Sequence, residues 1–383
     1  MSAGLRGSTA VVGVGHSHLG AAPGFTAIEI MAGAVEAALA DCGLGLGDID
    51  GVFAGSAVHA MPAVSLSEYL GIHPRFVEST NLGGSSFVAH TLSATMALAA
   101  GLCDVAVIAY GSNQRTASGR LVSSAEPQPY EAPYRPRHPI SAYALAASRH
   151  MHQYGTTRDE LAEVAVSARQ WANLNPEAFV QGPLSVADVL ASRMVSDPLS
   201  VLDCCLVTDG GGAVVMVRAE RARDFPKPPV YFLGAGVESS HRSIAQMADL
   251  TVSGAKASGA RAYAMAGLGP GDMDVLELYD AFTINTVLFL EDLGFCPKGE
   301  GGRFVAGGRI APGGALPVNT NGGGLSCVHP GMYGIFIVIE AVRQLRGEGG
   351  ARQVAGAETA LVHGNGGTLS TQVTSIFGTG ATL

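Results

Sequence analysis

Short apolar runs alternate with longer alanine-rich stretches along most of the chain. The apolar runs have the length and β-branched content of buried strands, and the alanine-rich stretches have the length of helices. In the first half, strands are expected at 9–13, 51–54, 75–78 and 105–109, with helices at 26–41, 64–70 and 86–100. This alternation predicts an α/β fold with largely buried strands.

The second half repeats the same scheme. Its strands are expected at 230–234, 275–278, 359–362 and 370–377, with helices at 244–267, 281–293 and 332–346. Each half also closes on a glycine turn followed by a β-rich strand, at 209–217 and at 366–377. We therefore predict a duplicated architecture with an N-terminal half, 1–225, and a C-terminal half, 226–383.

The segment 112–200 departs from this rhythm. It carries a cluster of prolines among tyrosine, arginine and histidine residues, and helices are expected after that cluster at 142–154 and 158–173. Long insertions of this kind often form lids or partner surfaces. We expect the segment to lie near the mouth of a functional site. A surface excursion that only packs against the core is the alternative.

Charge and hydropathy exclude some function classes. The 383 residues carry a net charge of −9 and only three lysines, whereas nucleic-acid binding needs a basic surface. The mean hydropathy is +0.27, yet the longest apolar stretch, around 91–101, is too short to cross a bilayer. The N-terminal apolar run is broken by glycines and predicts a first strand in place of a signal peptide, so a cytoplasmic location is expected.

The cysteines show no metal-binding or disulfide pattern. No CxxC spacing occurs among Cys42, Cys103, Cys204, Cys205, Cys296 and Cys327. Most are expected to be buried thiols that pack as small hydrophobic groups. We predict neither a metal nor a cofactor.

A series of glycine-rich and polar segments carries the strongest functional signal. They read VVGVG at 11–15, NLGGSSF at 81–87, TDGGGAVVMV at 208–217, ELYDAFT at 277–283, NTNGGGLSCVHPGMYG at 319–334 and HGNGGTLS at 363–370. In this order and spacing they resemble the thiolase superfamily over essentially the whole chain. The resemblance implies two βαβαβ-type repeats in a five-layered αβαβα arrangement, normally as a dimer.

The resemblance also shows what this chain lacks. Thiolases use a nucleophilic cysteine, an oxyanion hole of an asparagine-held water and a histidine, a histidine base and a second cysteine. Carried over by position, the chain offers Gly84 for the first cysteine, Tyr279 for the asparagine and His363 for the second cysteine, and keeps His329. Glycine cannot carry an acyl group, so ordinary thiolysis is not expected.

The pattern is similar to a thiolase-like subgroup called lipid-transfer proteins. Some of its members are retro-aldolases that shorten steroid side chains held as CoA thioesters. A tyrosine in a YD-x-F motif and a second tyrosine after the histidine motif are thought to carry their chemistry, and Tyr279 and Tyr333 match both. The resemblance further implies a small OB-fold or zinc-ribbon partner that forms a heterotetramer with the dimer.

Retro-aldol cleavage fits the residues present. The reaction needs a base for the β-hydroxyl proton, an oxyanion hole for the thioester enolate and an acid for the α-carbon, but no covalent intermediate. We expect His329 to donate to the thioester oxygen and Tyr279 to point into a crevice at a strand end. A tyrosine can act as acid or shuttle, and a neighbouring histidine or backbone dipoles would have to lower its pKa for it to act as base.

Other interpretations stay open at this point. Tyr279 and Tyr333 could be packing residues, and His363 could be a hydrogen-bonded core histidine. An active thiolase with a relocated nucleophile, at Cys327 or Cys103, is a second hypothesis. A non-catalytic scaffold that binds acyl-CoA or lipid is a third. The acyl group is not determined, and a homodimer is expected through the segment 75–82.

Overall fold

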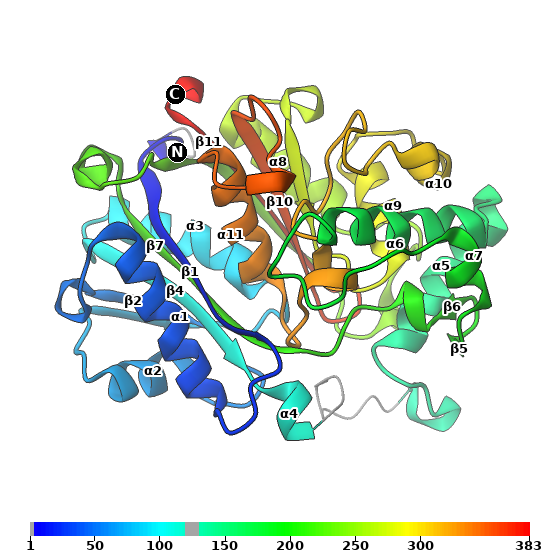
Figure 1. The fold of residues 1–383 in the computed structure, drawn as a ribbon, viewed down its shortest axis with the longest axis horizontal. Helices are drawn as coiled ribbons and strands as arrows, with labels where there is room; N and C mark the ends of the chain where they lie inside the picture. Colours follow the sequence, from blue (N-terminus) through cyan, green and yellow to red (C-terminus); the bar gives the residue numbers. More distant parts are fainter. Residues whose placement is uncertain (1–3, 119–129) are drawn as a thin grey trace.

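The computed structural model describes residues 4–118 and 130–383, and its centre is a nine-stranded mixed sheet (Figure 1). The strand order is β3-β2-β4-β7-β1-β8-β11-β10-β9. The bounds are β1 Thr9–Gly20, β2 Gly51–Ala54, β3 Phe76–Ser79, β4 Val105–Ser112, β7 Asp209–Arg218, β8 Val230–Ser239, β9 Val275–Leu278, β10 Thr359–Gly366 and β11 Thr371–Gly378. A separate small hairpin pairs β5 (Met194–Ser196) with β6 (Leu199–Ser200).

The two parts of the sheet repeat one pattern. In the first, β1 pairs antiparallel with β7, β7 antiparallel with β4, and β4 parallel with β2. In the second, β8, β11, β10 and β9 pair with the same order and the same directions. The parts meet only where β1 pairs with β8, at Ala10–Tyr231 and Val11–Val230. The expected α/β architecture of two similar halves is confirmed, whereas the boundary at residue 225 stays a prediction.

Helices cover both faces of the sheet and fill the space between its two parts. α1 packs on β1, β4 and β7, and α8 packs on β8 and β11, so each covers one outer face (Figure 1). α3 and α11 contact each other and strands of both parts, which makes them the central layer. The bounds are α1 Ala27–Cys42, α2 Pro62–Leu70, α3 Ser86–Ala99, α8 Ala255–Ala266, α9 Thr283–Asp292, α10 Gly301–Val305 and α11 Gly334–Leu345.

Local sequence explains how α1 sits on the sheet. Thr26 caps its first turn in a reciprocal capping box with Glu29, and Gly43 ends it in the left-handed conformation, at φ 74°. On β1, a Cβ added to Gly13 or Gly15 would overlap the backbone of α1. These glycines therefore let the helix and the strand pack backbone to backbone.

One predicted helix is wrong. The segment 244–267 was expected to be helical throughout, but its α-helix covers only Ala255–Ala266, and a short 3₁₀ turn stands at its start. Between them the Asp249 carboxylate accepts hydrogen bonds from the backbone N–H and the hydroxyl of Thr251. Aspartate that binds the backbone two residues ahead stabilises a turn in competition with the helix.

The segment 112–200 adds a helical region beside the second half. Its described parts include α4 (Gln114–Ser118), α5 (Ile140–Tyr154), α6 (Arg158–Ala172) and α7 (Val186–Ala191). α5 and α6 both pack on α9, at one side of the molecule (Figure 1). Part of the proline cluster, including Pro127 and Pro129, lies outside the described residues.

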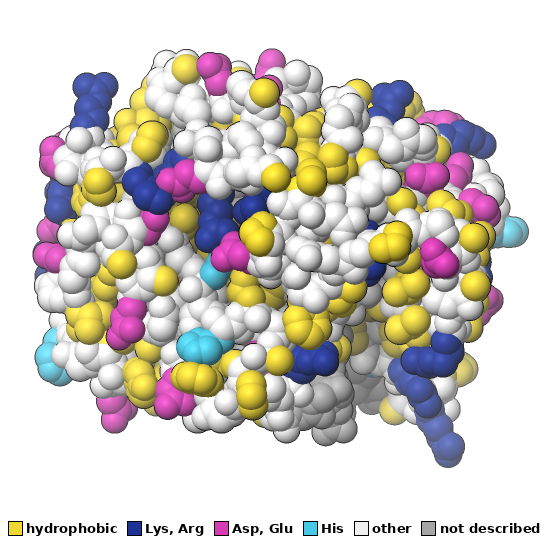
Figure 2. Space-filling view, in the orientation of Figure 1, with side chains coloured by type: hydrophobic (Ala, Val, Ile, Leu, Met, Phe, Trp, Pro, Cys, Tyr) yellow, Lys and Arg dark blue, Asp and Glu magenta, His cyan; other side chains and the backbone are white. Residues whose placement is uncertain are grey.

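The described surface has no continuous basic region on the face drawn in Figure 2, where Lys and Arg side chains are scattered among acidic ones. No helix within residues 4–118 and 130–383 is long and apolar enough to span a bilayer. In the same residues, no group of three His, Cys, Asp or Glu side chains converges as metal ligands would.

Candidate active site

A cavity of about 880 Å³ brings together several of the glycine-rich and polar motifs of the sequence from distant parts of the chain. Gly84 lines it from the turn before α3, and Tyr279 from the turn after β9. His329 and Asn365 line it from the C-terminal half, and Tyr143 of α5 lines it from the 112–200 segment. That segment therefore reaches the site, as its composition had suggested.

The Tyr279 ring fills the place of the missing nucleophile. A Cβ built on Gly84 would overlap Cε2, Cζ and the hydroxyl oxygen of Tyr279. A cysteine at position 84 and the observed tyrosine position are therefore sterically incompatible. The two departures from the thiolase pattern, Gly84 and Tyr279, are one structural change.

We expect Gly84→Ala to lower activity by about 10²-fold, because the added methyl group displaces the Tyr279 ring and small misplacements of reacting groups have effects of this size. The measurement is kcat with the substrate class proposed below. Gly47→Ala is the matched control, since a Cβ at Gly47 meets no atom within 4 Å. Equal activities of the two variants would contradict the proposed placement of Tyr279.

Three aromatic side chains pack together at the inner end of the cavity, and two of them, Tyr279 and His329, line it. The Tyr279 ring lies edge-on to His329 and to Tyr333, with centroid distances of 5.6 Å in both pairs. The backbone N–H of Tyr333 donates to the Tyr279 hydroxyl oxygen at 3.1 Å. Tyr333 is fully buried and does not itself line the cavity. Tyr279 is therefore the tyrosine placed to touch a ligand, and Tyr333 supports it from behind.

Both tyrosines are held protonated. Burial raises the pKa of Tyr279 and the pKa of Tyr333 well above the usual value of 10. A positively charged histidine beside a tyrosine would lower the pKa of that tyrosine. His329 does not do so, because burial lowers the pKa of His329 to about 4 and leaves its ring neutral at pH 7. These environments favour a tyrosine that donates or shuttles a proton over one that rests as tyrosinate.

His329 has a fixed backbone and a ring with free hydrogen-bonding atoms. Its backbone N–H donates to the Thr208 hydroxyl at 3.0 Å, and its carbonyl oxygen accepts from the Gln114 amide at 2.9 Å. Neither ring nitrogen has a hydrogen-bond partner, although both are buried. A buried, neutral, unpartnered imidazole in a cavity wall is suited to bind an oxygen of a ligand.

His363 lies apart from this wall. Its Nδ1 and Nε2 lie 2.9 Å from the Thr374 hydroxyl and 2.8 Å from the Gln372 carbonyl oxygen, and the residue does not line the cavity. Its own carbonyl oxygen accepts from the backbone N–H of Tyr279 at 2.9 Å. The structure therefore places three of the four predicted residues together and keeps the His363 ring in the sheet.

Asp280 connects the motif at 277–283 with the motif at 319–334 through hydrogen bonds. Its carboxylate accepts from the backbone N–H of Gly324 at 2.6 Å and of Leu325 at 3.4 Å, in the π-helical turn Gly323–Cys327 that leads to His329. Burial raises the pKa of Asp280 to about 7. The Tyr-Asp motif thus supplies a cavity-lining tyrosine and a carboxylate that holds the histidine loop.

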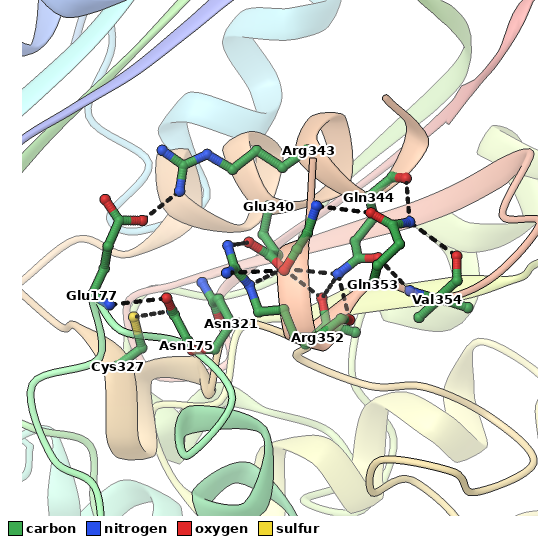
Figure 3. Close-up of polar contacts among 12 residues, drawn as sticks. Asn175, Glu177, Asn321, Cys327, Glu340, Arg343, Gln344, Arg352, Gln353 and Val354 are labelled. Carbon is green, nitrogen blue, oxygen red and sulfur yellow. Dashed lines mark hydrogen bonds and ion pairs between the residues drawn. The ribbon is translucent and has the colours of Figure 1, made fainter. Parts of the chain in front are cut away.

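A buried polar network stands behind Tyr333. Its hydroxyl donates to Oδ1 of Asn321 at 3.0 Å, and the Asn321 carbonyl oxygen accepts from Asn175 at 2.9 Å. Deeper in, Glu340 makes two hydrogen bonds of 2.9 Å with Arg352 (Figure 3). Burial disfavours charge on Glu340, but the ion pair with Arg352 outweighs it and holds the pKa of Glu340 below its usual range. These contacts lie behind Tyr333 and outside the cavity lining.

The candidate nucleophiles named from the sequence are not in the cavity wall. Cys103 and Cys327 are buried elsewhere, and burial raises the pKa of both thiols, that of Cys103 to about 12. Among the described cysteines Cys205 alone lines the cavity, a placement that the sequence did not indicate. Burial raises the pKa of Cys205 well above its usual value, which keeps it a weakly nucleophilic thiol.

Comparisons with known proteins agree with this architecture. Residues 236–379 match the family described as Thiolase C-terminal domain-like. An acetyl-CoA acetyltransferase of Methanothermobacter thermautotrophicus is 36% identical over 379 residues, covering 96% of this chain and 98% of that protein. A steroid side-chain-cleaving aldolase of Thermomonospora curvata is 34% identical over 364 residues, covering 90% of this chain and 91% of that protein.

A solved structure shows the same similarity in three dimensions. That of an Ltp2-ChsH2(DUF35) aldolase superimposes with a TM-score of 0.89 at 33% identity, and the match covers 98% of each chain. Family model, full-length relatives and fold all lead to one assignment. The chain belongs to the thiolase superfamily.

Proposed function

We propose that this protein is a thiolase-like retro-aldolase that cleaves a β-hydroxyacyl-CoA into a ketone and a shorter acyl-CoA. The observation that carries the proposal is the Tyr279 ring, which occupies the space beside Gly84 where a nucleophilic side chain would project. The aldolase relative and the aldolase structure support it. The cavity of about 880 Å³ is large for a short acyl chain and suits a bulky one, such as a steroid side-chain thioester.

In the proposed reaction Tyr279 shuttles a proton. Its oxygen takes the proton of the substrate β-hydroxyl, and its own proton passes to the α-carbon. As the bond between the α- and β-carbons breaks, the hydroxyl carbon becomes the ketone and the bonding electrons form the thioester enolate. Neutral His329 donates to the enolate oxygen. Tyr333 holds Tyr279 in place through its backbone N–H.

The direct test is a product assay. The purified protein, with a small OB-fold partner present, is incubated with a steroid β-hydroxyacyl-CoA, and mass spectrometry follows the products. We expect the ketone and the shortened acyl-CoA in equal amounts. Binding of the thioester with no cleavage would instead support the non-catalytic scaffold.

Acyl transfer is the second candidate, because one full-length relative is an acetyl-CoA acetyltransferase. We expect no thiolysis of a 3-ketoacyl-CoA and no acyl group on any cysteine. Because burial keeps Cys205 a weakly nucleophilic thiol, alkylation of the accessible cysteines should leave cleavage largely unchanged, in the wild type and in Cys205→Ala alike. An acyl-cysteine trapped by mass spectrometry would contradict the aldolase proposal.

A second copy of the chain is the proposed first partner. β3 (Phe76–Ser79) is an edge strand, so one side of its backbone is free to pair, and Val77 on it is 41% exposed. Nearby, Tyr69 and Met61 expose 52% and 63% of their surface. Exposed apolar groups beside an open sheet edge favour a homodimer through this segment.

The proposed second partner is a small protein of the DUF35 type, by analogy with the Ltp2-ChsH2(DUF35) aldolase. A partner on each copy of the dimer would give a heterotetramer. We expect co-expression to yield a complex whose mass, by light scattering, equals two copies of each chain. A monomer at micromolar concentration, or full activity without any partner, would contradict this assembly.

A further inference from the structure

One hydroxyl in the cavity wall has no hydrogen-bond partner. Thr368 lines the cavity and is 9% exposed, and its Oγ1 atom is buried without a partner among residues 4–118 and 130–383. A buried hydroxyl that makes no hydrogen bond is disfavoured, so its partner is to be sought outside the chain. None of the roles proposed above uses this hydroxyl.

Buried atoms of this kind are few in the cavity wall. Of the described lining residues, only His138, His329 and Thr368 carry them. The His138 side chain is 27% exposed, and its Nε2 lies 2.7 Å from a carboxylate oxygen of Glu131. His329 is the group proposed to bind the thioester oxygen. Thr368 is therefore the second buried polar group of the wall that is left for a ligand.

The backbone of Thr368 is held in place although its hydroxyl is not. Its N–H donates to the Ser370 hydroxyl at 3.1 Å, and Nε2 of His241 lies 2.9 Å from its carbonyl oxygen. A carbonyl oxygen only accepts, so His241 is the donor of this bond. These two contacts position the turn between β10 and β11 without any help from the hydroxyl, which stays available for a ligand.

This turn connects the reacting groups with a polar part of the cavity wall. On one side, a Cβ added to Gly83 would lie 2.8 Å from the backbone nitrogen of Gly367, so the turn lies against the glycine turn before α3. On the other side, the bond from His241 joins it to the segment 239–243, every residue of which lines the cavity. A substrate that reacts at the first side and extends a polar arm along the second passes Thr368.

We propose that the Thr368 hydroxyl binds an amide group of the pantetheine arm of an acyl-CoA. The inference rests on the function proposed above, which makes the substrate a CoA thioester. Pantetheine joins the thioester sulfur to the nucleotide and carries amide groups, whose carbonyl oxygens accept and whose N–H groups donate. A hydroxyl can match either of them. The thioester oxygen is already assigned to His329, and the nucleotide phosphates suit charged donors better than a hydroxyl.

Calorimetry tests this contact without turnover. Thr368→Val keeps the shape of the side chain and removes the hydroxyl. We expect CoA and acetyl-CoA to bind about five- to tenfold more weakly, the effect of one lost hydrogen bond, because both carry the same pantetheine arm. ADP, which represents the nucleotide without that arm, should bind the variant and the wild type equally. An unchanged affinity for CoA, or a loss confined to acetyl-CoA, would overturn the proposal.

Thr286→Val is the matched control. Thr286 is fully buried on α9, its Oγ1 also lacks a partner in the described part of the chain, and it does not line the cavity. This variant should bind CoA as the wild type does. Because neither hydroxyl makes a hydrogen bond within the protein, both variants should keep the wild-type Tm without ligand. A Tm lower in Thr368→Val than in Thr286→Val would attribute the weaker binding to a distorted turn and overturn the contact.

Binding and cleavage together separate this contact from the proposed reaction. CoA binding that depends on Thr368, without cleavage in the product assay, would refute the reaction and keep the contact. Cleavage by the wild type, with equal CoA affinities in the wild type and Thr368→Val, would keep the reaction and overturn the contact. A wild-type protein that binds no CoA would overturn both.

Discussion

Tyr279→Phe is expected to lower retro-aldol turnover by about 10²–10⁴-fold, the usual contribution of a general acid–base group. The substitution removes one hydroxyl and keeps the ring that packs edge-on to His329 and Tyr333. Because the hydroxyl acts on protons that move in the transition state, kcat should fall and KM should change little. Steady-state kinetics with a β-hydroxyacyl-CoA measures both.

Two further tyrosine variants make this result specific. Tyr263→Phe removes a hydroxyl outside the cavity and should keep wild-type kcat. Tyr333→Phe should have a smaller effect than Tyr279→Phe, because the Tyr333 hydroxyl donates to Asn321 and does not line the cavity. Wild-type turnover in Tyr279→Phe would remove that residue from the mechanism.

Arg352→Met is expected to lower the free energy of unfolding by about 3–5 kcal/mol, the effect of leaving one charge of a buried pair without its partner. Arg352 and Glu340 are 6% and 1% exposed, and two hydrogen bonds of 2.9 Å join them. Without the guanidinium, Glu340 would remain beside buried Glu277, whose pKa is raised well above its usual value by burial and by Glu340. Urea unfolding measures the loss.

Arg343→Met is the matched control for that prediction. Arg343, on the same helix as Glu340, pairs with Glu177 at 2.5 Å (Figure 3), but the Glu177 side chain is 41% exposed. Ion pairs that water reaches contribute about 0–1 kcal/mol, so this variant should unfold almost as the wild type does. Equal losses in the two variants would show that burial does not distinguish the pairs.

Regular elements could be predicted where the apolar pattern was long and local. The strands around 105–109 and 275–278 and the helix around 332–346 all lie at their predicted places, because the sheet and the central helices bury nearly every side chain they carry. The prediction of one continuous helix over 244–267 was wrong for a local reason. Alanines gave it a helical composition, but Asp249 and Thr251 form a turn inside it.

The residues of the candidate site could also be predicted only in part. Tyr279 and His329 could be found because they stand in motifs at the ends of elements, where side chains reach a common cavity. Tyr143 and Cys205 had no such signal, since they come from segments whose position depends on packing far from β9. Asn365 lies in the motif HGNGGTLS at 363–370, yet its hydrogen bonds to Tyr143 and Gln372 depend on strand register and on the position of α5.

The sequence by itself determined the α/β architecture, the resemblance to thiolases and the absence of a nucleophile at Gly84, because each depends on residue identity and order. The tertiary structure decided which groups share the cavity and in what protonation state. It placed the Tyr279 ring over Gly84, kept His363 in the sheet and raised the pKa of both motif tyrosines. These properties follow from burial and from contacts between distant segments, which no local pattern of residues contains.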